Sequence, residues 1–243
     1  MSGAQGPVWY ATESDVAVVH LDRPPVNAID LEMISKLGLM LDELSHKQGL
    51  RGVVLAGAGV NFSAGLDTKA VPGYGAEQLR ELSAAINRVV LMLYGLPMPT
   101  VAAIRGAALG GGFCLALTCD YRLCADQNAR LGLPEVTAGI PYPASPLDLI
   151  VAELDPNVRR RLALHGETLT PEAAKAAGVV DLLLPEDQLT ERAIETVLQL
   201  ARAPGYAAVK HQLRAPVLDR MRKHVETLDP IVGLILAQRK DRD

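Results

Sequence analysis

Hydrophobic positions along this chain repeat with the two-residue period of strands in some segments and with the roughly 3.6-residue period of helices in others. This pattern predicts alternating strands and helices in residues 1–145. Short apolar runs bounded by turn residues are typical of buried strands. Asp30 can cap a helix that has one apolar stripe, and a second amphipathic helix is predicted over residues 77–93. The stripe after Asp30 consists of Ile34, Leu37, Leu41 and Leu44. The predicted strands are residues 8–11, 15–21, 51–56, 101–104, 121–125 and 129–133, with a turn at 12–14 and a short apolar helix at 113–118.

The pattern changes near Pro146. From there to the C-terminus almost every segment has helical character, with breaks near Pro156, Gly166, Gly178 and Gly205. Alternating strands and helices followed by a run of helices predict an α/β core with a helical appendage. We therefore divide the chain into an α/β core of residues 1–145, which carries the active site, and a helical part of residues 146–243.

Composition and charge narrow the classes of function. Of the 243 residues 49% are hydrophobic and 21% charged, which predicts a packed globular protein. The net charge is −4 and the basic residues are scattered, so we expect no nucleic-acid partner. Residues 1–7 have no signal-peptide pattern, and no apolar run reaches the roughly 20 residues that cross a bilayer. We therefore expect a cytoplasmic protein without membrane attachment.

The sequence gives little support to several common site chemistries. Ala108 interrupts the dinucleotide-binding glycine pattern, and Ser63 lacks the preceding glycine of a nucleophile elbow. The five histidines form no pair at zinc-binding spacing. Three cysteines lie five residues apart, and five residues rotate a helix by about 140° beyond one full turn, so they share no metal-binding face. We expect buried thiols in a reducing compartment and no metal; the three cysteines are Cys114, Cys119 and Cys124.

Two glycine-containing turns are better candidates for a site. One is residues 62–67, which follow a predicted strand, and the other is residues 109–113, which open a predicted helix. Glycine lets the backbone approach a ligand closely, and a helix N-terminus presents unpaired N–H groups. Two such N–H groups that converge on one oxygen would form an oxyanion hole.

Four motifs in a fixed order carry a family resemblance. They are NAID at residues 27–30, FSAGLD at 62–67, GAALGGG at 106–112 with ALTCDYRLCA at 116–125, and LPEVTAGI at 133–140. Together they resemble the crotonase superfamily of enoyl-CoA hydratases and isomerases, over about residues 16–210. The resemblance implies an α/β fold, a crotonase-like spiral of β-β-α units with a helical C-terminal part. It also implies a homotrimer or a dimer of trimers.

The resemblance implies roles for particular residues. The backbone N–H groups of Leu66 and Gly111 match the two oxyanion-hole donors of the family. Leu66 and the three residues after it, Asp67, Thr68 and Lys69, fall where related enzymes meet the coenzyme A moiety. The implied substrate is an acyl-CoA thioester that reacts through an enolate. Coenzyme A then arrives as part of the substrate, and no separate cofactor is expected.

The acid/base residues depart from the hydratase pattern. Glu135 matches one of the two glutamates that hydratases of this family share, but Cys114 stands at the position of the other. Two carboxylates suit water addition, whereas one suits a proton shuttle between two carbons. In addition, Tyr142 or Pro143 replaces a glycine whose N–H helps hydratases to hold water, and proline has no N–H. Tyr142 would either donate a hydrogen bond to the substrate or form a wall of the acyl pocket.

The sequence therefore predicts an enzyme of the enoyl-CoA hydratase/isomerase family, with isomerisation favoured. The alternatives are an enoyl-CoA hydratase, a hydrolase or lyase of an unusual acyl-CoA, and a non-catalytic acyl-CoA-binding protein. An apolar set near helical spacing in the last third predicts an assembly surface. This set is Val217, Met221, Val225, Ile231, Leu234 and Ile235.

Overall fold

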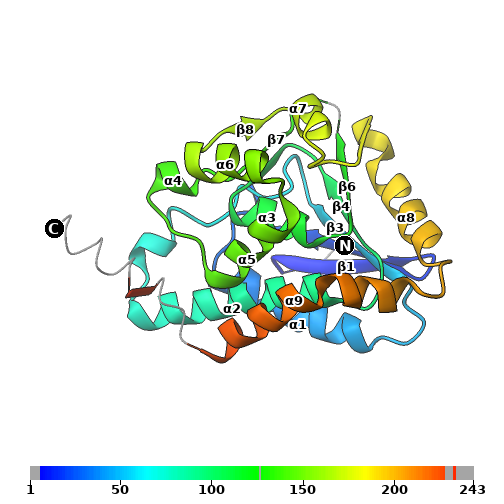
Figure 1. Cartoon of the computed structure of the whole chain (residues 1–243), viewed down its shortest axis with the longest axis horizontal. Helices are drawn as coiled ribbons and strands as arrows, with labels where there is room; N and C mark the ends of the chain where they lie inside the picture. The colour runs from blue at the N-terminus through cyan, green and yellow to red at the C-terminus, as the bar shows by residue number, and fades with distance from the viewer. Residues whose placement is uncertain (1–5, 126, 228–231, 234–243) are drawn as a thin grey trace.

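The computed structural model describes residues 6–125, 127–227 and 232–233 (Figure 1). The strands are β1 (Val8–Glu13), β2 (Val16–Leu21), β3 (Gly52–Gly57), β4 (Thr100–Ile104), β5 (Ala107–Leu109), β6 (Tyr121–Ala125), β7 (Arg130–Gly132), β8 (Thr168–Leu169) and β9 (Leu182–Leu184). The helices are α1 (Leu31–His46), α2 (Ala76–Gly95), α3 (Gly111–Thr118), α4 (Glu135–Ala138), α5 (Ala144–Glu153), α6 (Pro156–His165), α7 (Pro171–Ala176), α8 (Leu189–Leu200) and α9 (Tyr206–Glu226). Two 3-10 turns, η1 (Val71–Gly73) and η2 (Glu186–Gln188), complete the described elements.

The main sheet has the strand order β1-β2-β3-β4-β6-β9 in the described part of the chain. The pairing of β1 with β2 is antiparallel, and the other pairings in this sheet are parallel. Its central strands are apolar on both faces because both faces are covered. Alternate residues such as Val18, Val54 and Ala103 pack under α8, while Val19, Leu55 and Ala102 face the larger core. Figure 1 shows α8 on one side of the sheet, apart from the other long helices.

A second, smaller layer of strand pairings forms because the chain, after leaving each of several main-sheet strands, pairs again outside that sheet. After β2 the chain pairs Ile29 with Leu66, and after β3 it pairs Ser63 with Ala108. After β4 and β6 it forms β5 and β7, which pair in parallel, and β8 joins them. Each crossing leads into a helix: α1, α2, α3 and α4 in turn. This repeat confirms the predicted fold class, an α/β spiral of β-β-α units with helices in the C-terminal part.

The structure also corrects several predicted elements. Residues 107–109, which are not among the predicted strands, form β5, because they pair with β7. The C-terminal part is not purely helical: β8 joins the small sheet and β9 extends the main sheet beside β6. A strand of two or three residues is too short to show the alternating hydrophobic pattern, so the sequence does not distinguish it from the end of a helix. The first hairpin turns one residue later than predicted, at Ser14 and Asp15, whose φ angles are 51° and 62°.

A cluster of buried charges attaches α9 to the core. Asp120 accepts hydrogen bonds at Oδ2 from the Thr100 amide and from Lys210 Nζ, both at 2.8 Å. Its Oδ1 pairs with Arg214 Nη2 at 2.9 Å, and the Arg214 guanidinium lies 3.9 Å from the centre of the Tyr94 ring. Both oxygens of this carboxylate, whose side chain is 11% exposed, are therefore paired with positive groups.

The apolar set predicted for assembly is largely used within the chain. Val217 and Met221 are buried against the protein's own core, and Val225 is half-buried. Ile231, Leu234 and Ile235 lie outside the described residues. The homotrimer or dimer of trimers stays a prediction, and these two buried residues do not support it.

Candidate active site

The first glycine turn directs one backbone N–H into a pocket. Ile29 N donates to Gly65 O at 2.7 Å, and Asp67 N donates to Ile29 O at 2.8 Å. In a parallel pairing the residue between these two bonds faces the other way, so the N–H of Leu66 points away from Ile29. Gly65 has a φ of 85°, and a Cβ there would lie 2.5 Å from Leu109 O. Glycine is therefore required where the two turns touch.

The second glycine turn meets the first. Gly110 has a φ of 53° and donates its N–H to Gly132 O at 2.9 Å, which anchors the turn to β7. Gly111 then opens α3, so its N–H is one of the donors that an α-helix leaves unpaired. A Cβ on Gly111 would lie 4.0 Å from the Leu66 nitrogen, and both residues line the same pocket. The structure thus places Leu66 and Gly111, whose N–H groups the resemblance implies as oxyanion-hole donors, close together at one pocket.

Glu135 lies against this pair. It opens α4 directly after Pro134, and its Oε1 lies 2.8 Å from where a Cβ on Gly110 would be. Its Oε2 is buried and has no hydrogen-bond partner among the described residues. Burial away from water raises the Glu135 pKa to about 7, although its own backbone N–H and the Tyr142 hydroxyl partly oppose this by favouring the charged form. A carboxyl group with this pKa can both accept and release a proton near neutral pH.

The rest of the pocket is almost entirely apolar. It is lined by one face of α2, the start of α3, the loop between α4 and α5, and Val232. The α2 residues on this face are Leu79, Leu82, Ser83, Ile86 and Val90. Among the lining residues that the structure describes, Glu135 is the only carboxylate. Such a pocket suits an acyl chain close to one proton-transferring group.

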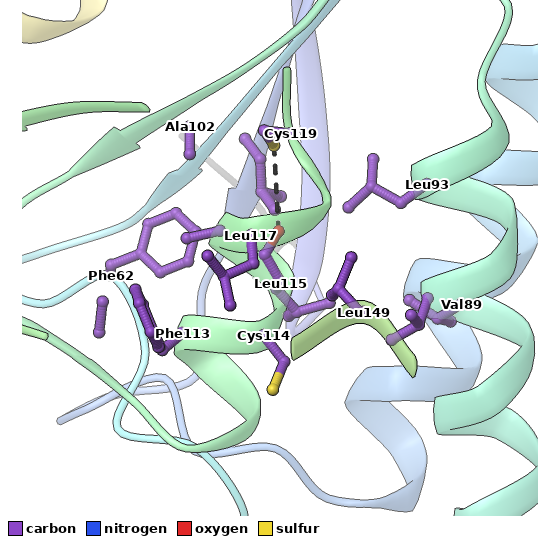
Figure 2. Close-up of a cluster of buried hydrophobic side chains, with 14 of the residues drawn as sticks. Phe62, Val89, Leu93, Ala102, Phe113, Cys114, Leu115, Leu117, Cys119 and Leu149 are labelled. Atoms are coloured by element: carbon purple, nitrogen blue, oxygen red, sulfur yellow. Dashed lines mark hydrogen bonds between the residues drawn. The ribbon is translucent and has the colours of Figure 1, made fainter. Parts of the chain in front are cut away.

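Cys114 contributes a wall of the pocket. The helix α3 that carries it is buried on nearly all sides, and Figure 2 shows its side chains packed among Phe62, Val89 and Leu149. Burial, together with the nearby Glu135 carboxyl, raises the pKa of the Cys114 thiol well above its usual value. The thiol is therefore protonated at neutral pH and a poor nucleophile.

The residues after Leu66 have different surroundings. Asp67 is buried: its Oδ1 accepts from the Lys69 and Ala70 amides, both at 2.9 Å, and its Oδ2 pairs with Arg23 at 2.7 Å. These bonds, first the one from Ala70, lower the Asp67 pKa and hold the turn. Thr68 lines the pocket and is exposed, as is Lys69. Contact of all three with coenzyme A stays a prediction, and the carboxylate of Asp67 is already occupied within the chain.

The sequence analysis did not predict the structural roles of Arg23 and Asn27, which hold neighbouring segments of the site together. Arg23 joins Asp67 to the α1 cap, since its Nε pairs with Asp30 Oδ2 at 3.0 Å. Asn27 donates from Nδ2 to Ala58 O and Asn61 O at 2.9 and 2.8 Å, and so ties the NAID segment to the first glycine turn. Their polar side chains within an apolar stretch were the only signal, and it does not name the partners.

Comparison with known proteins shows relatives in sequence and in fold. The family model for enoyl-CoA hydratase/isomerase matches residues 11–230, nearly the whole chain. The chain belongs to the enoyl-CoA hydratase/isomerase family. This confirms the predicted superfamily.

Some relatives of this chain are named as isomerases and others as hydratases. The human mitochondrial enoyl-CoA delta isomerase 1 is 35% identical over 85% of this chain and 70% of its own length. A putative enoyl-CoA hydratase of Thermus thermophilus is 36% identical, over 90% of this chain and 83% of its own. The solved human mitochondrial delta3-delta2-enoyl-CoA isomerase superposes with a TM-score of 0.82 at 28% identity, over 98% of this chain and 99% of its own. Family members act on acyl-CoA thioesters, and names alone do not choose between the two reactions.

The described residues offer neither a membrane-spanning helix nor a cluster of metal ligands. No helix in the described ranges is long and apolar enough to cross a membrane. No cluster of three or more potential metal ligands occurs among those residues.

Proposed function

We propose that this enzyme moves the double bond of a 3-enoyl-CoA to the 2-position, with Glu135 as its single acid/base. The observation that supports this most directly is the buried Oε2 of Glu135, without a partner among the described residues, in the same pocket as the neighbouring backbones of Leu66 and Gly111. A pKa of about 7 lets the same group remove and return a proton. Coenzyme A enters as part of the substrate, so the reaction calls for no separate cofactor.

The proposed reaction has two proton transfers. Glu135 removes a proton from C2, and negative charge develops on the thioester oxygen. The N–H groups of Leu66 and Gly111 donate to that oxygen and stabilise the enolate, where each such donor is typically worth about 10²–10³ in rate. Glu135 then returns the proton to C4, and the double bond comes to lie between C2 and C3.

Isomerisation is favoured over hydration by what surrounds Glu135. Adding water to C3 calls for a group that activates or holds the water, and hydration profits from a second acid/base. The candidate at that position, Cys114, is a buried, protonated thiol. The relatives named enoyl-CoA delta isomerase support the same choice, at 32–35% identity.

Three assignments go with this proposal. Thr68 and Lys69, both exposed near the pocket, would meet the coenzyme A moiety. The protein would assemble as a homotrimer or a dimer of trimers, which light scattering against the 25.9 kDa chain mass tests. A cytoplasmic location stays a prediction; the human enoyl-CoA delta isomerase 1 named above is mitochondrial.

One substrate screen tests the function. Purified protein is assayed with 3-enoyl-, 2-enoyl- and 3-hydroxyacyl-CoA esters of matched chain length. We expect kcat/KM for isomerisation to exceed that for hydration, and equal or faster hydration would overturn the isomerase assignment. Hydration is the second candidate because the Thermus thermophilus relative is named a putative hydratase.

The remaining alternatives give distinct outcomes in the same screen. Release of free coenzyme A would indicate a hydrolase, and cleavage of a carbon–carbon bond a lyase. Saturable calorimetric binding without turnover of any ester would indicate a non-catalytic acyl-CoA-binding protein.

A further inference from the structure

The apolar pocket meets solvent close to the proposed reacting groups, which are the Leu66 N–H and the Glu135 carboxyl. Of the lining residues, Thr68 and Ala138 are exposed, and each follows one of these two groups within three positions of the chain. A coenzyme A moiety therefore has room outside the pocket on this side. The acyl chain extends from here into the protein.

Three helices close the buried side of the pocket. Ile34 of α1, Val90 of α2 and Leu115 of α3 line it, and each of these side chains is at most 2% exposed. Leu115 lies one turn further along α3 than Gly111, which corresponds to about 6 Å. Figure 2 shows Leu115 in the same buried cluster as Val89, the residue before Val90.

Behind these side chains α1 and α2 are in direct contact. Gly38 lies one turn after Ile34 in α1, and a Cβ placed on Gly38 would be 3.4 Å from Val89 Cγ2. That distance is van der Waals contact, so the two helices leave no room for a chain to pass between them at this level. The depth of the pocket is therefore set by the side chains that line its buried side.

The volume of the pocket limits the length of chain that it can hold. The pocket measures about 140 Å³. An apolar protein cavity of about 150 Å³ binds benzene, so this pocket has room for about six carbons of an acyl group. Those carbons include the reacting positions, because Leu66, Gly111 and Glu135 line the same pocket.

We propose that the protein selects uncharged acyl groups of about six carbons, and that Val90 and Leu115 set this limit. The inference deepens the proposed isomerase function and rests on it for the placement of the thioester. A longer chain has to displace side chains that are packed in the core. A carboxylate at the far end of the chain would be buried without a cation, because the described lining residues include no Lys, Arg or His.

The test measures binding, so it does not depend on turnover. Dissociation constants of the saturated esters from butanoyl-CoA to dodecanoyl-CoA are measured by calorimetry. Each methylene buried in the pocket should tighten binding by about fourfold. This gain should stop at about six to eight carbons. Adipoyl-CoA, which has a carboxylate where hexanoyl-CoA has its terminal methyl group, should bind about tenfold more weakly than hexanoyl-CoA, or weaker still.

Variants of the two closing side chains test their role. Leu115→Ala and Val90→Ala each open the buried side, so the gain should continue for about two further carbons. Val90→Leu adds a methylene and should make the gain stop at a shorter chain. Leu117→Ala is the matched control, because Leu117 is a fully buried leucine of α3 that does not line the pocket. It should lower stability and leave the chain-length profile unchanged. If Leu115→Ala does not fold, Val90→Ala makes the smaller change.

The outcomes separate this inference from the proposed function. Binding that still tightens by about fourfold per methylene up to dodecanoyl-CoA would overturn the length limit. Unchanged profiles in the Val90 and Leu115 variants that fold would overturn the role of these side chains. Length-limited binding without isomerisation of 3-hexenoyl-CoA would count against the isomerase reaction alone and leave the length limit standing.

Discussion

Two carboxylates that are largely shielded from solvent, those of Asp120 and Glu135, have opposite surroundings. Asp120 lies beneath α9 with Lys210 at one oxygen and Arg214 at the other. Glu135 lies in the apolar pocket, and its Oε2 has no partner among the described residues. Both carboxyl groups are shielded from water, but of the two only Asp120 has cationic partners among the described residues.

The difference shows how burial can serve structure or chemistry. A carboxylate that is paired at both oxygens holds distant elements together, here β4, the residue before β6 and α9. A carboxyl without a positive partner has its pKa raised toward neutrality, which makes it able to exchange protons. No cation among the described residues contributes to the Glu135 pKa, and this suits the carboxyl to the proposed proton transfer.

The largest expected effect comes from removing the lone carboxyl. Glu135→Gln keeps the shape but cannot accept a proton, so turnover of the best 3-enoyl-CoA should fall by about 10²–10⁴. Glu172→Gln, at an exposed position on α7, is the control and should leave turnover unchanged. A loss of less than about tenfold at position 135 would remove Glu135 from the mechanism.

The converse change removes the paired carboxyl. Asp120→Asn leaves Lys210 and Arg214 buried without a counter-charge, and we expect the free energy of unfolding to fall by about 3–5 kcal/mol. Denaturant unfolding measures this. Asp219→Asn breaks an exposed pair with Arg222 and should cost less than about 1 kcal/mol. Equal effects of the two substitutions would show that the Asp120 cluster is not structural.

The pH dependence of activity follows from the lone carboxyl. Glu135 must be charged to take a proton, and its pKa is about 7. Below pH 7, kcat/KM should therefore fall by about tenfold per pH unit, and above it the profile should level off. A profile with its midpoint near the ordinary glutamate value would contradict the unpaired environment.

Glu135 should also make the stability of the fold depend on pH, in a direction that its raised pKa determines. The raised pKa means that the folded protein holds the Glu135 proton more tightly than the unfolded chain, so this group stabilises the fold below about pH 4.5. That contribution is lost as the pH rises to about 7. Glu135→Gln should therefore raise the melting temperature relative to wild type more at pH 8 than at pH 5. A difference of the opposite sign would mean that the carboxylate has a positive partner.

The smallest expected effect comes from adding a second carboxyl. Cys114→Glu places a glutamate in the pocket wall, but Tyr142 and Pro143 remain. Hydration of a 2-enoyl-CoA should rise only modestly, well below the roughly 10²-fold that a fully placed acid/base contributes. A larger gain would mean that Cys114 alone limits hydration.

Much of the site could be predicted from the sequence because its parts are local. The stripe of α1, the cap at Asp30, both glycine turns and Glu135 each lie within a few consecutive residues whose type and spacing carry the signal. The role of Asp67 illustrates the limit. Its place in a motif suggested a ligand contact, but its partner Arg23 lies 44 positions earlier, and no local pattern points to that pair.

The sequence by itself determined most of the long helices and the two glycine turns, since backbone preference and hydrophobic period act over neighbouring residues, and its resemblance to a known family indicated the candidate base. Only the tertiary structure decided that β5 and β9 are strands, that Leu66 and Gly111 lie close together at one pocket, and that Glu135 Oε2 has no partner among the described residues while both oxygens of Asp120 are paired. Strand pairing and the pKa of a buried carboxyl depend on groups brought together from distant parts of the chain. Their electrostatic and hydrogen-bonding environment does not exist until the chain has folded.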